Sequence, residues 1–175
     1  MNRRDLRKRY WGTAGAWVGC IYSTLYAVRP ICEFLKETIP FAFLTNLGMA
    51  ALLVWITAVF YSRRHLYSPL SYFLLALVFL CYVYGLMKIS HPEEKIHFIE
   101  YGVLAYFLWR ALRLDWKGGR AYVGAFALTT LLGWADEGIQ HLLPNRYYQA
   151  GDVFLNSMSG LLALILVFIF QKKSS

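Results

Sequence analysis

Six long apolar runs, separated by charged or proline-containing breaks, constrain the fold of this chain more than any other feature. They cover approximately Trp11 to Val28, Phe41 to Tyr61, Leu70 to Ile89, Lys95 to Leu112, Ala121 to Leu143 and Asp152 to Phe170. Each run is close to the ~20 residues that a helix needs to cross a bilayer. None shows the strict alternation of a membrane strand. The sequence therefore predicts an all-α polytopic transmembrane bundle of about six helices.

The composition indicates a surface that faces lipid. Hydrophobic residues make up 58% of the 175 residues and charged residues 16%, whereas soluble domains have about 45–50% apolar and about 25% charged residues. At this length we expect one membrane domain covering residues 1–175. The net charge of +8 does not indicate nucleic acid as a partner, because the basic residues lie between the apolar runs and orient a chain in the bilayer there.

The basic residues also predict how the bundle is oriented. If the N-terminus is cytoplasmic and the runs alternate in direction, the cytoplasmic segments carry 13 of the 18 Lys and Arg residues. This asymmetry follows the positive-inside rule, so both termini are expected to be cytoplasmic.

Proline-containing breaks predict where helices end. Arg29-Pro30 is expected to end the first helix, because proline lacks the N–H that a helix interior requires. Residues 31–39 mix apolar and charged side chains and are expected to form a short interfacial segment. After the break at His91-Pro92, residues 93–95 are expected to form a solvated loop.

Polar stripes occur at the ends of three runs that the orientation places on the outer side. Their members are His97, Glu100 and Tyr101 in the fourth run, Glu137, Gln140 and His141 in the fifth, and Asp152, Asn156 and Ser159 in the sixth. The spacings of three, four and seven put each set on one helix face. Because ionisable groups facing lipid are costly, we expect these stripes to turn inward and line a polar cleft.

Such a cleft has the residue types that acid/base chemistry on a phosphate ester requires. His97 is predicted as the general acid or base, with Glu100 or Glu137 as its partner. Arg146 is predicted to hold a phosphate through its fork of donors. The side chains predicted to position the head group are Tyr101, Gln140, Asp152 and Asn156.

Two other interpretations of the stripes remain open. His97, Glu137, His141 and Asp152 could hold a metal ion, although no tight ligand motif supports that interpretation. The sequence therefore predicts neither a metal nor a cofactor. The polar side chains could also only join helices to one another by hydrogen bonds.

Three segments resemble the signatures of VanZ-like membrane proteins. Their sequences are EEKIHFIEYG at residues 93–102, DEGIQHLLPNR at 136–146 and DVFLN at 152–156, the last followed by Gly160. The likeness covers roughly residues 91–165 and rests on the order and spacing of all three segments. Residues 1–90 match only as apolar helices.

The resemblance implies a location and a class of function. It implies a multi-pass protein of the bacterial inner membrane, in a family named after a protein linked to low-level teicoplanin resistance. It also implies kinship with enzymes that act on lipid head groups, with the polar cleft as the active site.

The leading hypothesis is therefore a membrane-embedded enzyme, a transferase or hydrolase, at the outer face. It would modify the head group of a phospholipid or a lipid-linked glycan by transfer or exchange at a phosphate ester. The alternative is a non-catalytic accessory subunit or assembly factor of a larger membrane complex. A small transporter is less favoured, because the polar groups lie near one face of the predicted bundle and do not run through its midplane.

Overall fold

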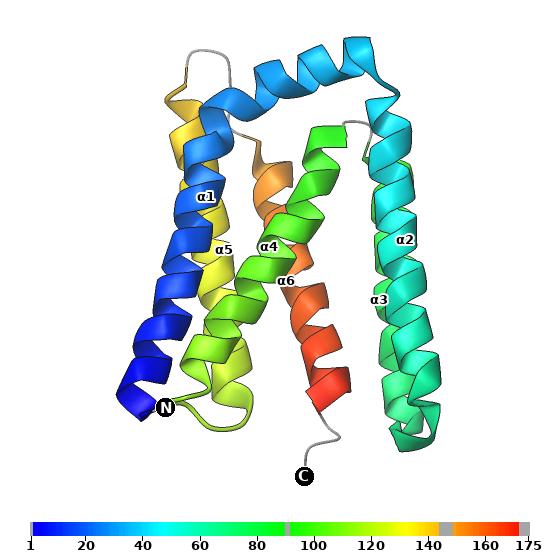
Figure 1. Cartoon of the computed structure of the whole chain (residues 1–175), viewed down its shortest axis with the longest axis vertical. Helices are drawn as coiled ribbons and strands as arrows, with labels where there is room; N and C mark the ends of the chain where they lie inside the picture. Colours follow the sequence, from blue (N-terminus) through cyan, green and yellow to red (C-terminus); the bar gives the residue numbers. More distant parts are fainter. Residues whose placement is uncertain (1, 90–91, 144–148, 172–175) are drawn as a thin grey trace. The chain divides into compact units, whose positions relative to one another are not determined.

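The structure is a computed structural model that describes residues 2–89, 92–143 and 149–171 (Figure 1). The elements in order are α1 (Arg3–Thr38), α2 (Phe41–Ser62), the short 3-10 helix η1 (Arg64–Leu66), α3 (Pro69–Lys88), α4 (Pro92–Leu112), α5 (Gly119–His141) and α6 (Ala150–Gln171). No strand occurs among the described residues. The predicted all-α class is confirmed.

Two of these helices are long and apolar enough to cross a membrane. They are α2, with a mean hydropathy of 1.9 over its most apolar window, and α6, with 2.4. Only 17% of the α2 window is buried within the protein, so most of this apolar helix needs an environment other than the chain itself. That these and the remaining helices cross a membrane stays a prediction.

The predicted helix end at Arg29-Pro30 is wrong, because α1 continues through Pro30 to Thr38. A proline removes one donor and disturbs one turn, but the hydrogen bonds on either side of it can persist. Residues 31–38, expected as a separate segment, are therefore part of α1.

The chain divides into two compact units, and Pro30 marks one boundary between them. The first unit comprises Met1–Arg29 and His97–Leu164, and the second comprises Pro30–Ile96 and Ile165–Ser175. Each unit has its own packing. The expectation of a single membrane domain stays a prediction.

In the first unit, α1 lies beside α4 and α5 (Figure 1). The indole Nε1 of Trp17 donates to the backbone carbonyl of Glu100 at 2.9 Å. The hydroxyl of Tyr22 donates to the carbonyl of Leu132 at 2.7 Å. These two bonds fix the position of α1 along both neighbouring helices.

Two glycines allow α4, α5 and α6 to approach closely. A Cβ atom at Gly160 of α6 would lie 2.7 Å from Cγ2 of Thr129. A Cβ at Gly133 of α5 would lie 2.9 Å from Cβ of Asn156 and 3.3 Å from the ring of Tyr101. Both positions exclude a larger side chain, as is common where membrane helices pack tightly. The absence of a side chain at Gly133 leaves room for Tyr101 and Asn156 at the same level.

The second unit contains an aromatic cluster and a buried lysine. Phe60 stacks on Tyr67 with 4.2 Å between ring centroids, and Phe170 lies edge-on to Phe60 at 6.4 Å. Lys95 is only 5% exposed and donates from Nζ to Oδ1 of Asn46 at 2.8 Å. The prediction of a solvated loop is therefore wrong for Lys95, because α4 already begins at Pro92 and carries this side chain into a packed position.

Candidate functional site

The stripe predicted on α4 faces the interior of the first unit. Tyr101 has no exposed surface, and its hydroxyl donates to Oδ2 of Asp136 at 2.7 Å. Nδ1 of His97 lies 3.4 Å from Oε2 of Glu100, and these side chains are 13% and 23% exposed. That distance is within ion-pair range, but the two groups lack the geometry of a hydrogen bond. The other ring nitrogen of His97, Nε2, is left for a further partner.

The carboxylate of Glu137 on α5 is fully buried and held by two donors. Its Oε1 accepts from Nε2 of Gln140 at 3.2 Å, and its Oε2 accepts from the backbone N–H of Gln149 at 3.1 Å. Because the two donors engage different oxygens, the orientation of the carboxylate is fixed.

Asp136 and Asn156 contribute buried polar atoms that the helices do not satisfy. Both side chains are fully buried. Within residues 2–89, 92–143 and 149–171, Oδ1 of Asp136 and both amide atoms of Asn156 lack a hydrogen-bond partner. Buried polar atoms without a partner cost about 1–3 kcal/mol each, so a polar group that reached them would recover that free energy.

The first unit thus brings most of the predicted site residues together. We call the following set the polar cluster: His97, Glu100, Tyr101, Asp136, Glu137, Gln140, Asp152 and Asn156. Asp152 is half-buried near the start of α6, and its charge acts on both His97 and Glu137. Arg146, predicted to bind phosphate, lies outside the described residues. The catalytic and binding roles of all these residues stay predictions.

The stripe predicted on α5 was partly wrong. His141 is the last residue of α5 and is exposed, whereas Asp136 is fully buried. At about 100° per residue, Gln140 lies between Asp136 and Glu137 around the helix. His141 lies beyond Glu137, farther from the face that Asp136 and Gln140 share.

Asp136 is the member of the polar cluster that the sequence reasoning missed. The sequence does contain a signal, because Ala125, Thr129, Gly133, Asp136 and Gln140 recur at helical spacing and are all buried. A continuous stripe of small and polar residues at that spacing identifies Asp136 as inward-facing.

Ser159, the third member of the predicted α6 stripe, has a local role. Its hydroxyl donates to the carbonyl of Leu155 on its own helix at 2.7 Å. A serine with that bond has used its only donor.

Among the described residues, no group of three or more His, Cys, Asp or Glu side chains could hold a metal ion. The polar cluster instead combines a histidine beside a carboxylate, a second carboxylate fixed by two donors, and an unsatisfied amide. Chemically, this set can move a proton and bind several polar atoms of one ligand.

Comparison with known proteins gives a family match. A family model described as VanZ/LLP1 matches residues 21–171, which is most of the chain. No curated protein matches, and no solved structure does.

Proposed function

The chain belongs to the VanZ/LLP1 family, and on that premise we propose that it is a multi-pass enzyme of the bacterial inner membrane. It would modify the head group of a phospholipid or a lipid-linked glycan at the outer face. Family membership is consistent with a membrane protein linked to antibiotic resistance.

The observation that carries the proposal is the set of buried polar atoms left without partners. Asp136 and Asn156 come from α5 and α6, and both are fully buried. Asn156 lies against Gly133 of α5. A cluster that served only to join helices would be expected to pair these atoms with one another. A polar ligand that enters between the helices supplies the missing partners.

The geometry supports a division of roles. His97 is the proton-transfer group, because Nδ1 faces Glu100 and Nε2 is left for the substrate. Glu137 is oriented by Gln140 and the Gln149 N–H. Tyr101, Gln140, Asp152 and Asn156 position the head group, while Arg146 belongs to the proposal as the phosphate ligand by family resemblance alone.

The proposed reaction is a displacement at phosphorus. The oxygen of an incoming alcohol or water bonds to phosphorus while its proton passes to Nε2 of His97. The bond from phosphorus to the departing alcohol oxygen then breaks as this proton is delivered to that oxygen. General acid–base assistance of this kind contributes about 10²–10⁴-fold in rate.

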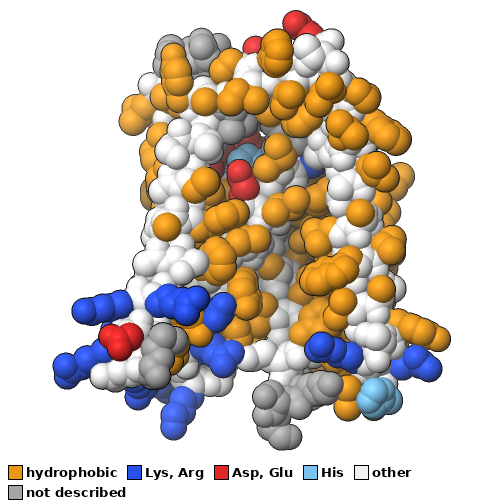
Figure 2. All heavy atoms as spheres, in the orientation of Figure 1, with side chains coloured by type: hydrophobic (Ala, Val, Ile, Leu, Met, Phe, Trp, Pro, Cys, Tyr) orange, Lys and Arg blue, Asp and Glu red, His pale blue; other side chains and the backbone are white. Residues whose placement is uncertain are grey.

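The placement at the outer face rests on the charge at the two ends of the first unit. Figure 2 shows Lys and Arg side chains gathered at the end that contains the start of α1. Arg110 lies in the last turn of α4 at that end, whereas His97 lies near the other end of the same helix. The positive-inside rule assigns the basic end to the cytoplasm, and the polar cluster then faces outward.

The test is turnover in a defined membrane. The purified full-length protein is reconstituted into vesicles made from a total bacterial lipid extract, and lipid head groups are followed by mass spectrometry. His97→Gln and Glu137→Gln are expected to lower the rate of head-group change at least about 100-fold. His141→Gln, which changes an exposed histidine, is the matched control and is expected to keep the wild-type rate.

The same assay separates the enzyme from the non-catalytic alternative. An accessory subunit is favoured by one observation, namely that both oxygens of Glu137 already have partners within the chain. Wild-type turnover by His97→Gln would reject the role of His97, whereas no lipid change by the wild type would reject catalysis. Recovery of a stoichiometric membrane complex would then support the alternative.

A further inference from the structure

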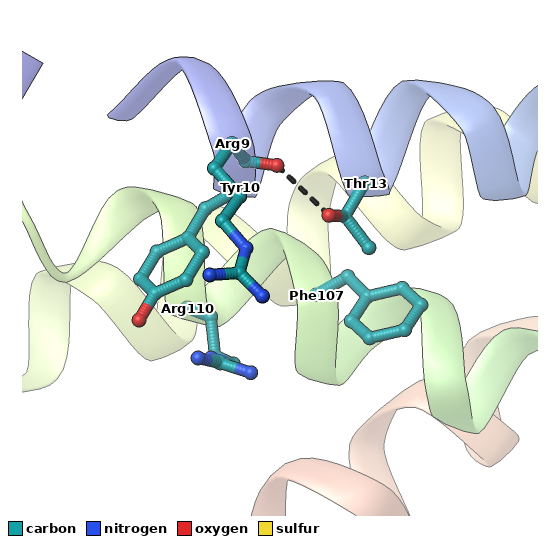
Figure 3. Close-up of a pocket in the computed structure, with 5 residues that line it drawn as sticks. All are labelled: Arg9, Tyr10, Thr13, Phe107 and Arg110. Atoms are coloured by element: carbon teal, nitrogen blue, oxygen red, sulfur yellow. Dashed lines mark hydrogen bonds between the residues drawn. The ribbon is translucent and has the colours of Figure 1, made fainter. Parts of the chain in front are cut away.

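A second candidate site lies near the other end of α4, away from the polar cluster. A cavity of about 170 Å³ is lined by Arg9, Tyr10 and Thr13 of α1 and by Phe107 and Arg110 of α4 (Figure 3). We call it the basic pocket. His97 and Arg110 are thirteen residues apart on one helix, or about 20 Å at 1.5 Å per residue, so the two sites are separate.

The two arginines of the basic pocket have no acidic partner. The nearby carboxylate of Asp115 lies 3.3 Å from Nε of Arg7 and 4.0 Å from the guanidinium of Arg3. Throughout the part of the chain that the structure describes, no ion pair involves Arg9 or Arg110. The basic pocket therefore has two positive charges that its surroundings leave uncompensated.

Two aromatic rings hold the charge of Arg110 in place. The guanidinium of Arg110 lies 4.2 Å from the ring centroid of Tyr10 and 5.6 Å from that of Tyr106, and stacking on rings restricts its plane. Figure 3 shows the side chain of Arg9 extending from α1 toward α4, where the side chain of Arg110 and the ring of Phe107 lie. Thr13 donates to the carbonyl of Arg9 at 2.8 Å.

A phosphate group fits this chemistry. Two guanidinium groups offer forks of N–H donors that match phosphate oxygens. Since a water occupies about 30 Å³ in the liquid, a 170 Å³ cavity has room for a phosphate and the atoms next to it. The ring of Phe107 gives one side of the pocket an apolar surface, which suits the glycerol and acyl part of a lipid.

We propose that the basic pocket binds a phosphate ester, with an anionic phospholipid of the cytoplasmic leaflet as the source. The phosphate site follows from the pocket itself. The lipid as source rests on the proposed membrane orientation, which puts this end of the first unit at the cytoplasmic surface, where anionic lipids meet basic pockets between helices.

The test measures binding of two probes to the full-length protein. The protein is placed in nanodiscs of phosphatidylcholine containing a small fraction of fluorescent phosphatidylglycerol, and binding is read from energy transfer to that lipid. Inorganic phosphate is added to the same discs as the competing probe. If phosphatidylglycerol binds specifically and phosphate displaces it only at millimolar or higher concentration, the lipid is the source of the phosphate ester. Displacement by micromolar phosphate would overturn the assignment of the lipid as the source.

The variants decide whether the binding belongs to the pocket. Arg9→Gln with Arg110→Gln is expected to weaken phosphatidylglycerol binding at least about tenfold, because hydrogen bonds to charged groups are lost. Arg4→Gln with Lys117→Gln removes the same charge from exposed positions and is expected to change the affinity less than about twofold, as exposed charges act weakly.

Two outcomes overturn the proposal. An equal loss in both double variants shows a general attraction of basic residues for the membrane. Unchanged binding in the pocket variant shows that Arg9 and Arg110 are not ligands. Arg9→Gln alone keeps the test decisive if the double variant does not fold, because Arg9 is exposed and supports no packing; it is expected to weaken binding about threefold or more.

Discussion

The polar cluster and the basic pocket lie near opposite ends of one helix, and they are built in different ways. In the polar cluster, Tyr101, Asp136 and Glu137 have no exposed surface, and a side-chain hydrogen bond from Tyr101 to Asp136 joins α4 to α5. In the basic pocket, Arg9 is exposed and Arg110 is half-buried, and ring stacking holds the latter. The polar cluster is therefore part of the core of the first unit, whereas the basic pocket lies at the surface of that unit.

This difference separates what each region contributes to stability. A buried polar group depends on its partner, because losing the partner leaves a desolvated atom unpaired. An exposed charge regains water when its partner is removed. Changes in the cluster should therefore alter folding, and changes at the basic end should alter mainly what the surface attracts.

The largest expected effect on stability is that of Tyr101→Phe. Loss of the hydroxyl leaves Asp136 fully buried with neither carboxyl oxygen paired among the described residues. The free energy of unfolding in detergent micelles is expected to fall by about 2–3 kcal/mol. Tyr26→Phe removes a hydroxyl from a side chain that is 71% exposed and serves as the control; an equal effect of the two variants would contradict a special role for burial.

A smaller effect is expected from Gly160→Ala, which tests the close helix contact beneath the cluster. The new Cβ would lie 2.7 Å from Cγ2 of Thr129, so α5 and α6 must move apart, at a cost of about 1–2 kcal/mol. Gly138→Ala adds the same methyl group where no atom lies within 4 Å and is expected to be neutral or slightly stabilising. Thermal unfolding of both variants measures the difference, and shifts of the same sign would speak against the contact.

The smallest effect is expected from Asp115→Asn at the basic end. This change removes the ion pair with Arg7, whose side chain is 60% exposed, and pairs of this kind contribute less than about 1 kcal/mol. The midpoint of chemical unfolding should scarcely move. A loss as large as that of Tyr101→Phe would mean that the two regions do not differ as described.

Much of the helical pattern was predictable, because apolar length and breaks are local properties. The starts and ends of α2 and α3 lie within a residue or two of the predicted runs. The inward stripes on α4 and α6 were also correctly placed for Tyr101 and Asn156, which are fully buried. Helical spacing and the cost of burying charge suffice for these inferences.

The remaining features depend on contacts between distant parts of the chain. The continuation of α1 through Pro30 contradicts the local preference of proline. Lys95 is buried because Asn46, 49 residues away, accepts its hydrogen bond. The basic pocket joins Arg9 to Arg110, and no periodicity in the sequence relates two positions so far apart.

The bonds from Trp17 and Tyr22 to backbone carbonyls of α4 and α5 have a further consequence for α1. They anchor the middle of α1. The direction in which the side chains of its first turns point therefore depends on the number of residues between Thr13 and Trp17. One residue inserted there would rotate everything upstream by about 100° and carry Arg9 and Tyr10 away from Arg110. The length of this short stretch, rather than its side chains, thus keeps the α1 residues of the basic pocket facing its α4 residues.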